Sequence, residues 1–317
     1  MRIGATLLLG ACAFRPGISG DAGGSADASD GARPTCLQRW VAHTIAFDAG
    51  APLANVNMTG PADRDPFLSD DELTLYFDSD RSGAPTVVTL SWTSTRATIG
   101  ADFATPVMLP GAIDGMPQVS KLATTKDGLD AVLSSNRPTS NAGSFDLWEA
   151  TRNMEAMAFM PPNETDLVMD ETAADEFDPW LSPDGLHLYF SPESVVPGGH
   201  QNLSFATRTA RGSAFGPPTV ISELDNDFGE GDPALTYDET VMVYTSTQTG
   251  SIGNTDLWYA TRASTSDPFG TPELVPDVNT PANDGDAHIS PDGCRLYFAT
   301  DRDGVAGDYD LYVATMQ

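Results

Sequence analysis

Short segments of apolar or alternating apolar and polar residues recur along the chain from about residue 40 to its end. Examples are residues 73–77, 186–191, 241–244 and 296–298, and turns rich in Gly, Pro, Asp and Asn separate them. This pattern is typical of short antiparallel strands joined by tight turns. No apolar run approaches eighteen residues, so we expect no ordinary transmembrane helix. The pattern predicts an all-β protein.

One phrase introduces five of these strands. The segment 177–185, Phe-Asp-Pro-Trp-Leu-Ser-Pro-Asp-Gly, precedes one strand, and residues 285–293 repeat it before another. Similar copies begin at Asp65 and Asp232, and a looser copy runs from 116 to 133. The turn positions are 56, 57, 54 and 54 residues apart, at Glu72, Gly128, Gly185, Glu239 and Gly293. A strand-only repeat of this length predicts the blades of a β-propeller.

Two further phrases complete each repeat and indicate how the ring closes. Three units run into Ala-Thr-Arg, ending at Arg152, Arg208 and Arg262, and a Phe…Pro phrase closes most units. The last unit ends at Gln317 without that phrase, but residues 47–57 match residues 269–279. An N-terminal strand can therefore complete the last blade and remove an exposed sheet edge. We predict five four-stranded antiparallel blades, with six blades as the alternative.

The turn Ser-Pro-Asp-Gly at 182–185 and 290–293, together with Ser/Thr-x-Arg at 79–81, 135–137 and 300–302, resembles the WD40-like repeat of the TolB C-terminal domain. The resemblance covers about residues 40 to 317. It implies a propeller in the cell envelope with a protein partner at the channel mouth, since TolB binds a peptidoglycan-associated lipoprotein. TolB has six blades and a separate N-terminal domain, and this chain departs from both features.

The N-terminus carries the features of an export signal. Met1-Arg2 is followed by the apolar run 3–11 and then by Cys12, and Leu9-Gly10-Ala11-Cys12 resembles the lipobox of bacterial lipoproteins. We therefore expect a signal peptide at 1–11, lipidation of Cys12, a flexible Gly/Ala/Ser/Asp tether at 12–35 and a propeller at 36–317. Ala13 is not the Asp that retains lipoproteins at the inner membrane. We expect an outer-membrane anchor facing the periplasm or the cell surface.

Lipidation of Cys12 would leave two cysteines, Cys36 and Cys294. An even number suits one disulfide in an oxidising compartment. The predicted ring closure would also bring these two residues near each other. Two free buried thiols are the alternative.

Charge narrows the classes of partner. The chain has 45 acidic and 16 basic residues, a formal net charge of -29. Nucleic acid and anionic lipid surfaces need a basic face, so we exclude the first and disfavour the second. A membrane contact is expected only through the lipid anchor.

Four of the acids recur at equivalent positions, Asp65, Asp178, Asp232 and Asp286, and Met116 is assigned to this position in the second unit. His288, two residues after the last of them, is placed in the same candidate ring, with core or surface filling as its alternative role. The loops before the first strand and between the second and third strands share one face, so we predict an acidic, partner-binding ring at the channel mouth. The alternative is that each Asp caps its own turn.

Metal and catalytic motifs are weak. Asp301 and Asp303 resemble the start of a calcium loop, but Tyr312 stands where the EF-hand requires an acid, so no metal site is assigned and calcium stays a candidate. We find no hydrolase, phosphate-binding or redox motif. The sequence favours a non-enzymatic envelope lipoprotein that acts as a protein-interaction scaffold. The alternative is a glycan-binding propeller, or a glycoside-cleaving one that resembles the arabinanase and levansucrase group.

Overall fold

The computed structural model describes residues 34–81, 89–110, 118–136, 145–161, 174–194, 199–304 and 307–317. The chain divides into a segment of residues 1–33, which lies outside the described residues, and a compact unit of residues 34–317. Cys12 and Met116 also lie outside the described residues. In the part of the chain that is described, no helix has the length and apolar character needed to span a bilayer.

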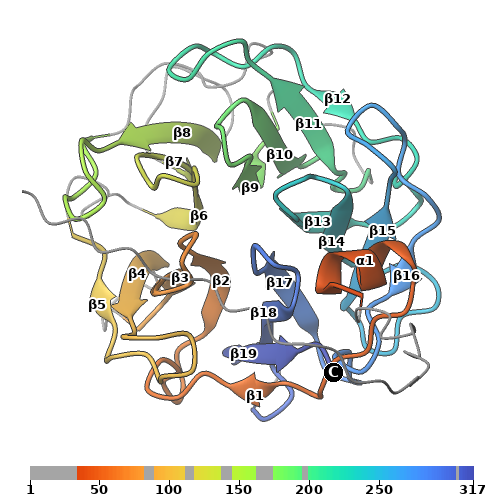
Figure 1. Ribbon diagram of the computed structural model, residues 1–317, viewed down its shortest axis with the longest axis horizontal. Coiled ribbons are helices and arrows are strands. Elements are labelled where there is room, and N and C mark those ends of the chain that lie inside the picture. Colours follow the sequence, from red (N-terminus) through yellow and green to blue (C-terminus); the bar gives the residue numbers. More distant parts are fainter. Residues whose placement is uncertain are drawn as a thin grey trace, which may run out of the picture. The chain divides into compact units, whose positions relative to one another are not determined.

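The strands form five antiparallel sheets arranged as blades around a centre (Figure 1). The first blade contains β2 (Asp63–Leu68), β3 (Thr74–Ser79), β4 (Leu90–Thr95) and β5 (Val107–Met108). The described residues of the second blade form three strands, β6 (Val119–Thr124), β7 (Asp130–Ser135) and β8 (Asp146–Thr151).

The remaining blades follow the same order from the centre outward. The third contains β9 (Glu176–Leu181), β10 (His187–Pro192), β11 (Ser204–Thr207) and β12 (Thr219–Val220). The fourth contains β13 (Glu230–Leu235), β14 (Val241–Ser246), β15 (Asp256–Thr261) and β16 (Glu273–Leu274). The fifth combines β17 (Asp284–Ile289), β18 (Arg295–Thr300) and β19 (Asp310–Thr315) with β1 (Ala51–Pro52) from the N-terminal side.

The five-bladed prediction is confirmed, and the six-bladed alternative is wrong. The inner strands β2, β6, β9, β13 and β17 surround the centre in Figure 1, and each contacts the inner strands of both neighbouring blades. Apolar side chains from facing blades fill the spaces between the sheets, for example Leu133 and Leu188 in one cluster and Phe298 and Tyr259 in another. The core therefore lies between blades and leaves the axis to polar residues.

The predicted closure by an N-terminal strand is also confirmed. Ala51 pairs with Val313 and Pro52 with Tyr312, so β1 becomes the outer strand of the fifth blade. Phe47 forms a bridge with Met316 at the place where the other blades put their Phe…Pro phrase. Closure of the ring in this way joins the N-terminal segment to the last strand, β19, by backbone hydrogen bonds and covers the edge of that strand.

Helix α1 (Cys36–Val41) lies against the same blade and is fixed there by a disulfide. Thr35 and Gln38 form a capping box at its start, which satisfies backbone N–H groups of the first turn. Cys36 is bonded to Cys294 with an S–S distance of 1.98 Å. Gly293 has a φ of +72°, and a Cβ there would lie 2.8 Å from the Leu37 side chain, so only glycine fits this turn beneath the helix.

A repeated arginine joins each of the first four blades to the blade before it. Its Nε donates to a turn carbonyl of its own blade at 2.6 to 2.8 Å, and its guanidinium lies over a phenylalanine ring 4.3 to 4.5 Å from the centroid. Its Nη2 donates to a residue of the preceding blade. The four arginines are Arg96, Arg152, Arg208 and Arg262. This network explains why Ala-Thr-Arg recurs in the sequence.

Candidate functional site

A β-bulge interrupts every inner strand at the same position. The pairing shifts register there, and the residues at this position have φ values between 40° and 57°. They are Asp65, Lys121, Asp178, Asp232 and Asp286. Aspartate tolerates the left-handed region better than most residues, and a following proline, present after three of them, needs no hydrogen-bond partner in the ladder. The five-fold repeat thus places five charged side chains at one level.

Lys121, and not Met116, occupies this position in the second blade. The structure therefore corrects the alignment used for that unit, in which Met116 was placed opposite the aspartates. The correct residue lies four positions before the Ser/Thr of the turn, as Asp65 lies four before Ser69 and Lys121 four before Thr125. Counting back from the turn would have identified Lys121 from the sequence alone.

The aspartates of this ring do not cap turns. Among the described residues, no backbone N–H donates to the carboxylates of Asp65, Asp178, Asp232 or Asp286. A different aspartate accepts the turn N–H in every blade, as Asp71 does from Leu73 at 2.9 Å and Asp292 does from Cys294 at 2.9 Å. The ring carboxylates are therefore available for another role.

Three ring carboxylates lie close enough to share one ligand. Oxygens of Asp65, Asp232 and Asp286, which come from the first, fourth and fifth blades, all lie within 4.8 Å of one another. This is the one group of three or more acidic, His or Cys ligands with such spacing that the described residues contain. Carboxylate oxygens at this spacing fit a hard cation such as Ca²⁺.

The pKa values of three ring carboxyls, those of Asp65, Asp178 and Asp286, are raised. Burial, followed by repulsion from Asp78 and Asp232, raises the pKa of Asp65 to about 7. Burial and neighbouring carboxylates also raise the pKa of Asp178 and of Asp286 well above the ordinary value. The ring therefore holds protons near neutral pH, because close, buried carboxylates cannot all ionise together.

Lys121 supplies a cation to the ring. Its side chain is 1 % exposed, and Nζ has no hydrogen-bond partner among the described residues. Burial alone would lower the pKa of Lys121, but the four ring carboxylates outweigh this effect and raise it. The backbone N–H of Lys121 donates to the buried carboxyl of Asp78 at 2.5 Å, which holds the bulge in place.

A polar cavity of about 260 Å³ opens beside the ring. Asp232 and Asp286 form part of its wall, and the other lining side chains include Arg64, Gln201, Ser246 and Tyr309. The guanidinium of Arg64 lies 4.0 Å from the centroid of the Tyr309 ring. The cavity thus combines carboxylates with hydroxyl, amide and guanidinium groups from four blades. We call it the axial cavity.

Turn residues meet on the opposite face of the ring. Lys126 Nζ lies 3.6 Å from a carboxylate oxygen of Asp70 and 5.6 Å from the centroid of the Tyr237 ring. Burial and a hydrogen bond with Asp70 raise the pKa of Tyr237 above its ordinary value. These residues come from the first, second and fourth blades, so they bridge blades across the face that lies away from the axial cavity.

The structure places His288 inside the wall between the fifth and first blades. Its side chain is 4 % exposed, and its ring lies 4.7 Å from that of Phe67 in an edge-on arrangement. Burial, followed by the charge of Lys121, lowers the pKa of His288 to about 3, so the imidazole is neutral. His288 follows the ring by two residues, as expected, but it does not line the axial cavity.

Asp301 and Asp303 bind protein donors and do not form a cluster of ligands. Asp301 accepts hydrogen bonds from the backbone N–H of Asn283 at 2.8 Å and of Gly307 at 2.9 Å, and these bonds hold its pKa below the ordinary value. Asp303 accepts a hydrogen bond from the Tyr312 hydroxyl. Neither residue belongs to the described group with metal-ligand spacing.

The arginines of the Ser/Thr-x-Arg phrase pair with acids that begin their own blades. Arg81 Nη2 lies 2.5 Å from Asp63, and Arg302 Nη2 lies 2.7 Å from Asp284. Both guanidinium groups also donate to a backbone carbonyl of the segment before their blade. Arg137 lies outside the described residues. The described pairs are structural and hold the first strand of each blade to the segment that precedes it.

Comparisons with known proteins show the fold and no family. No protein family and no curated protein matches the chain. TolB from Acinetobacter baumannii superposes with a TM-score of 0.44 at 12% identity, over 80% of this chain and 54% of that one.

Two glycoside-cleaving enzymes superpose over more of their length. A thermostable family-43 glycoside hydrolase gives a TM-score of 0.57 at 13% identity, over 84% of this chain and 96% of that one. The endo-arabinase from Bacteroides thetaiotaomicron gives 0.55 at 12% identity, over 86% and 97%. Likeness at such identities establishes a shared fold and leaves the activity open. The chain is therefore a five-bladed β-propeller that has structural neighbours among glycoside hydrolases.

Proposed function

We propose that this protein is a non-enzymatic interaction scaffold whose axial cavity receives a cationic group of a partner protein. The observation that carries the proposal is the charge of the ring: four aspartates face one lysine, and two of the aspartates line the cavity. Burial, followed by repulsion from Asp78 and Asp232, raises the pKa of Asp65 to about 7. A cation in the cavity would relieve the repulsion and release protons from the ring.

The dimensions of the site favour a single side chain over a broad surface contact. A cavity of about 260 Å³ is small for a drug-sized ligand, and its acids are set back among the inner strands. A lysine or arginine side chain fits such a recess and would find acceptors in Asp232 and Asp286. The net charge of -29 adds a long-range attraction for a basic partner.

We also propose that the scaffold is exported to the cell envelope and anchored there through Cys12. The disulfide between Cys36 and Cys294 supports an oxidising compartment. Metabolic labelling with a fatty-acid analogue tests the anchor. Wild-type protein should carry the label and Cys12→Ser protein should not; label retained by Cys12→Ser would contradict lipidation at this residue.

Photo-crosslinking at the cavity tests the scaffold. A photoreactive amino acid at Thr247, which lines the cavity and is exposed, should capture one envelope protein when the full chain is mixed with the native envelope fraction. Asp232→Asn combined with Asp286→Asn should abolish the capture, because the cationic group loses both acceptors. The same amino acid at Thr265, an exposed position on an outer loop of the fourth blade, is the matched control.

Two results would contradict the scaffold. One is capture of the same proteins from Thr265 as from Thr247, which would indicate non-specific contact. The other is capture from Thr247 that survives the double asparagine change, which would separate the partner from the ring. Asp267→Asn removes one exposed negative charge elsewhere and should leave the capture unchanged.

A second candidate function is glycoside cleavage, and a buried acid near the cavity favours it. Burial, followed by repulsion from Asp225, raises the pKa of Glu230 to about 8, and Ser246, which lines the cavity, donates to Glu230 at 3.4 Å. A carboxyl that keeps its proton near neutral pH can act as a general acid, and glycoside cleavage needs such an acid and a second carboxylate.

A polysaccharide panel distinguishes the two candidates. Release of reducing ends by the wild-type protein, lost in both Glu230→Gln and Asp286→Asn, would establish hydrolysis. Retention on a glycan without release would indicate a glycan-binding protein. No retention and no release across the panel would leave the scaffold as the function to pursue.

A further inference from the structure

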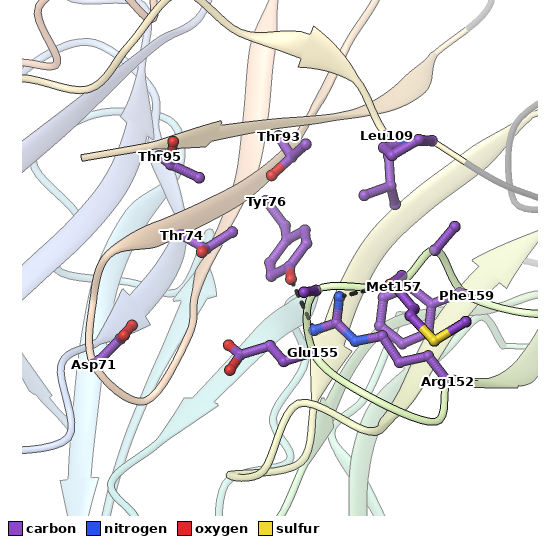
Figure 2. Close-up of a pocket in the computed structure, with 13 residues that line it drawn as sticks. Asp71, Thr74, Tyr76, Thr93, Thr95, Leu109, Arg152, Glu155, Met157 and Phe159 are labelled. Atoms are coloured by element: carbon purple, nitrogen blue, oxygen red, sulfur yellow. Dashed lines mark hydrogen bonds between the residues drawn. The ribbon is translucent and has the colours of Figure 1, made fainter. Parts of the chain in front are cut away.

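A second cavity, of about 400 Å³, lies between the first and second blades (Figure 2). Asp71 and Glu155 stand at one end of it, and Leu109, Met157 and Phe159 lie at the other. Arg152 lies between these ends, where it donates to the Tyr76 hydroxyl at 3.2 Å and to the Met157 carbonyl at 3.4 Å. The cavity therefore has an acidic end and an apolar end.

At the next interface around the ring, the equivalent space between blades is occupied by an arginine side chain. Between the second and third blades, Arg211 occupies the position equivalent to Glu155, three residues after the repeated arginine. Its guanidinium donates to Asp127 at 2.7 Å and to Asp130 at 2.5 Å, and it holds the pKa of Asp127 at about 2. Asp127 is the equivalent of Asp71. The turn acid of this interface thus binds a guanidinium that the chain itself supplies.

At three other interfaces between blades, side chains or a helix of this protein also occupy the equivalent space. Arg295 lies 2.5 Å from Glu72 between the fifth and first blades, and His187 lies 2.8 Å from Glu239 between the third and fourth. Helix α1 fills the space between the fourth and fifth, where Trp40 is fully buried. The interface between the first and second blades differs from these, because its open cavity carries two acids to which, among the described residues, no cation is bound.

The charge and shape of this cavity match a guanidinium group on an aliphatic stem. Glu155 is exposed and has no hydrogen-bond or ion-pair partner among the described residues, and Asp71 faces the same end of the cavity. A guanidinium placed there would lie beside Arg152 as Arg211 lies beside Arg208, since a Cβ at Gly185 would touch both of the latter side chains, at 3.2 and 3.5 Å. The three-carbon stem of an arginine would reach the apolar end.

The rim of the cavity indicates the source of that group. The loop that carries Glu155 also exposes Met154, Met157 and Met160, with 60%, 45% and 45% of each side chain accessible. Exposed methionines adapt to varied apolar surfaces and are over-represented at protein-binding sites. We propose that the cavity between the first and second blades binds an arginine side chain of a polypeptide partner, through Asp71 and Glu155.

An NMR titration of the full chain tests this site. The probe is N-acetyl-L-arginine methylamide, and the signal is the ¹³C-labelled methyl group of Met157, assigned by Met157→Leu. The resonance should shift to a saturable end point with the arginine probe. N-acetyl-L-norleucine methylamide has a similar stem without the charge and should bind at least about tenfold more weakly, because two carboxylates lose a cation. Equal shifts with both probes would overturn the proposal.

Two substitutions separate an arginine site from a merely apolar one. Glu155→Gln should weaken binding about fivefold, as expected for a partly exposed ion pair. Glu155→Arg should abolish it, because the new side chain would bind Asp71 as Arg211 binds Asp127, and this variant should unfold at an equal or higher temperature than the wild type. Retained binding in Glu155→Arg would overturn the proposal. Asp267→Asn and Asp286→Asn should leave binding unchanged, and the second keeps this site distinct from the axial cavity.

A titration with a peptide tests whether the guanidinium belongs to a polypeptide. The pentapeptide Ala-Ala-Arg-Ala-Ala should bind more tightly than the single-residue probe, because its flanking residues contact the methionine rim. A pentapeptide that binds more weakly than the probe would overturn the polypeptide partner and assign the cavity to a free guanidinium compound.

Discussion

Trp40 donates its indole N–H to the carbonyl oxygen of Gly293 at 2.9 Å. In the other four blades an arginine donates to the equivalent turn carbonyl, but the fifth blade has Met316 at that position. Trp40 also packs against the rings of Phe47 and Tyr259, with centroid distances of 5.6 and 5.1 Å. Helix α1 therefore takes over the role of the missing arginine, and the disulfide holds it in place.

Removal of the disulfide should loosen this closure. Cys36→Ser combined with Cys294→Ser should lower the free energy of unfolding by about 2–5 kcal/mol, because the bond spans 258 residues and restricts the unfolded chain. Urea unfolding followed by tryptophan fluorescence measures the change. Trp40→Phe keeps the disulfide and should cost about 2–3 kcal/mol, because the buried side chain loses volume and the Gly293 carbonyl loses its donor. An unchanged urea midpoint in the double serine variant would contradict a stapling role for helix α1.

Arg208 should be worth more to stability than Arg211, although both bind acids of the second blade. Arg208 is fully buried and lies 2.8 Å from Glu149, so Arg208→Met would leave a buried carboxylate without a cation and should cost about 3–5 kcal/mol. Arg211 is 35% exposed, so Arg211→Met should cost about 1 kcal/mol or less. Chemical denaturation of both variants measures the difference.

The double variant Glu149→Leu/Arg208→Met provides the control for this buried pair. Removal of both charges leaves no unpaired ion. The double variant should therefore regain a large part of the stability that Arg208→Met loses. A double variant that is less stable than Arg208→Met alone would show that the pair contributes packing and hydrogen bonds beyond its charge balance.

The repeat made the blade number and the ring closure predictable, since the turns recur every 54 to 57 residues and residues 47–57 match residues 269–279. The acidic ring was also visible in the sequence, because Asp65, Asp178, Asp232 and Asp286 recur at one position. Lys121 was missed because the second unit was aligned on its proline, Pro117, and not on its turn. The period of the repeat thus locates the ring of aspartates, but it does not locate the one blade in which a lysine replaces the aspartate.

Features that depend on differences between blades could not be read from the repeat. Glu155 stands where the next unit has Arg211, and the consequence of that change appears only when the facing turn acids are placed in space. His288 illustrates the same limit, because its burial against Phe67 follows from the packing of two blades. The comparison of equivalent interfaces, and not the repeat itself, reveals the cavity between the first and second blades.

The contribution of Asp65 to stability should fall as the pH rises from about 4 to 7. The folded-state pKa of Asp65, about 7, lies above its ordinary value of 3.8, so the folded protein holds a proton that the unfolded chain releases. The stabilisation is complete below pH 4 for this group and is lost as the pH passes 7, at up to about 1.4 kcal/mol per pH unit. Calorimetry at constant ionic strength measures the melting temperature across this range.

Asp65→Asn isolates the contribution of that carboxyl. The variant cannot titrate at this position, so its melting temperature should change less between pH 5 and pH 7 than that of the wild type. Asp267→Asn removes an exposed negative charge and should keep the wild-type slope. Parallel profiles for wild type and Asp65→Asn would show that the proton is held elsewhere.

Lys121 should weaken calcium binding by the acidic ring. Its ammonium lies near the three carboxylates whose oxygens are within 4.8 Å of one another, and it repels a divalent ion that approaches them. Lys121→Met should therefore bind Ca²⁺ on the order of tenfold more tightly than the wild type, since one buried repulsion is removed. The readout is the rise in melting temperature with CaCl₂ at pH 7.5. Lys126→Met removes an exposed charge on the opposite face and should leave that rise unchanged. Equal calcium responses in all three proteins would show that Lys121 does not control cation binding, because a cation held by Asp65, Asp232 and Asp286 must sense the ammonium beside them.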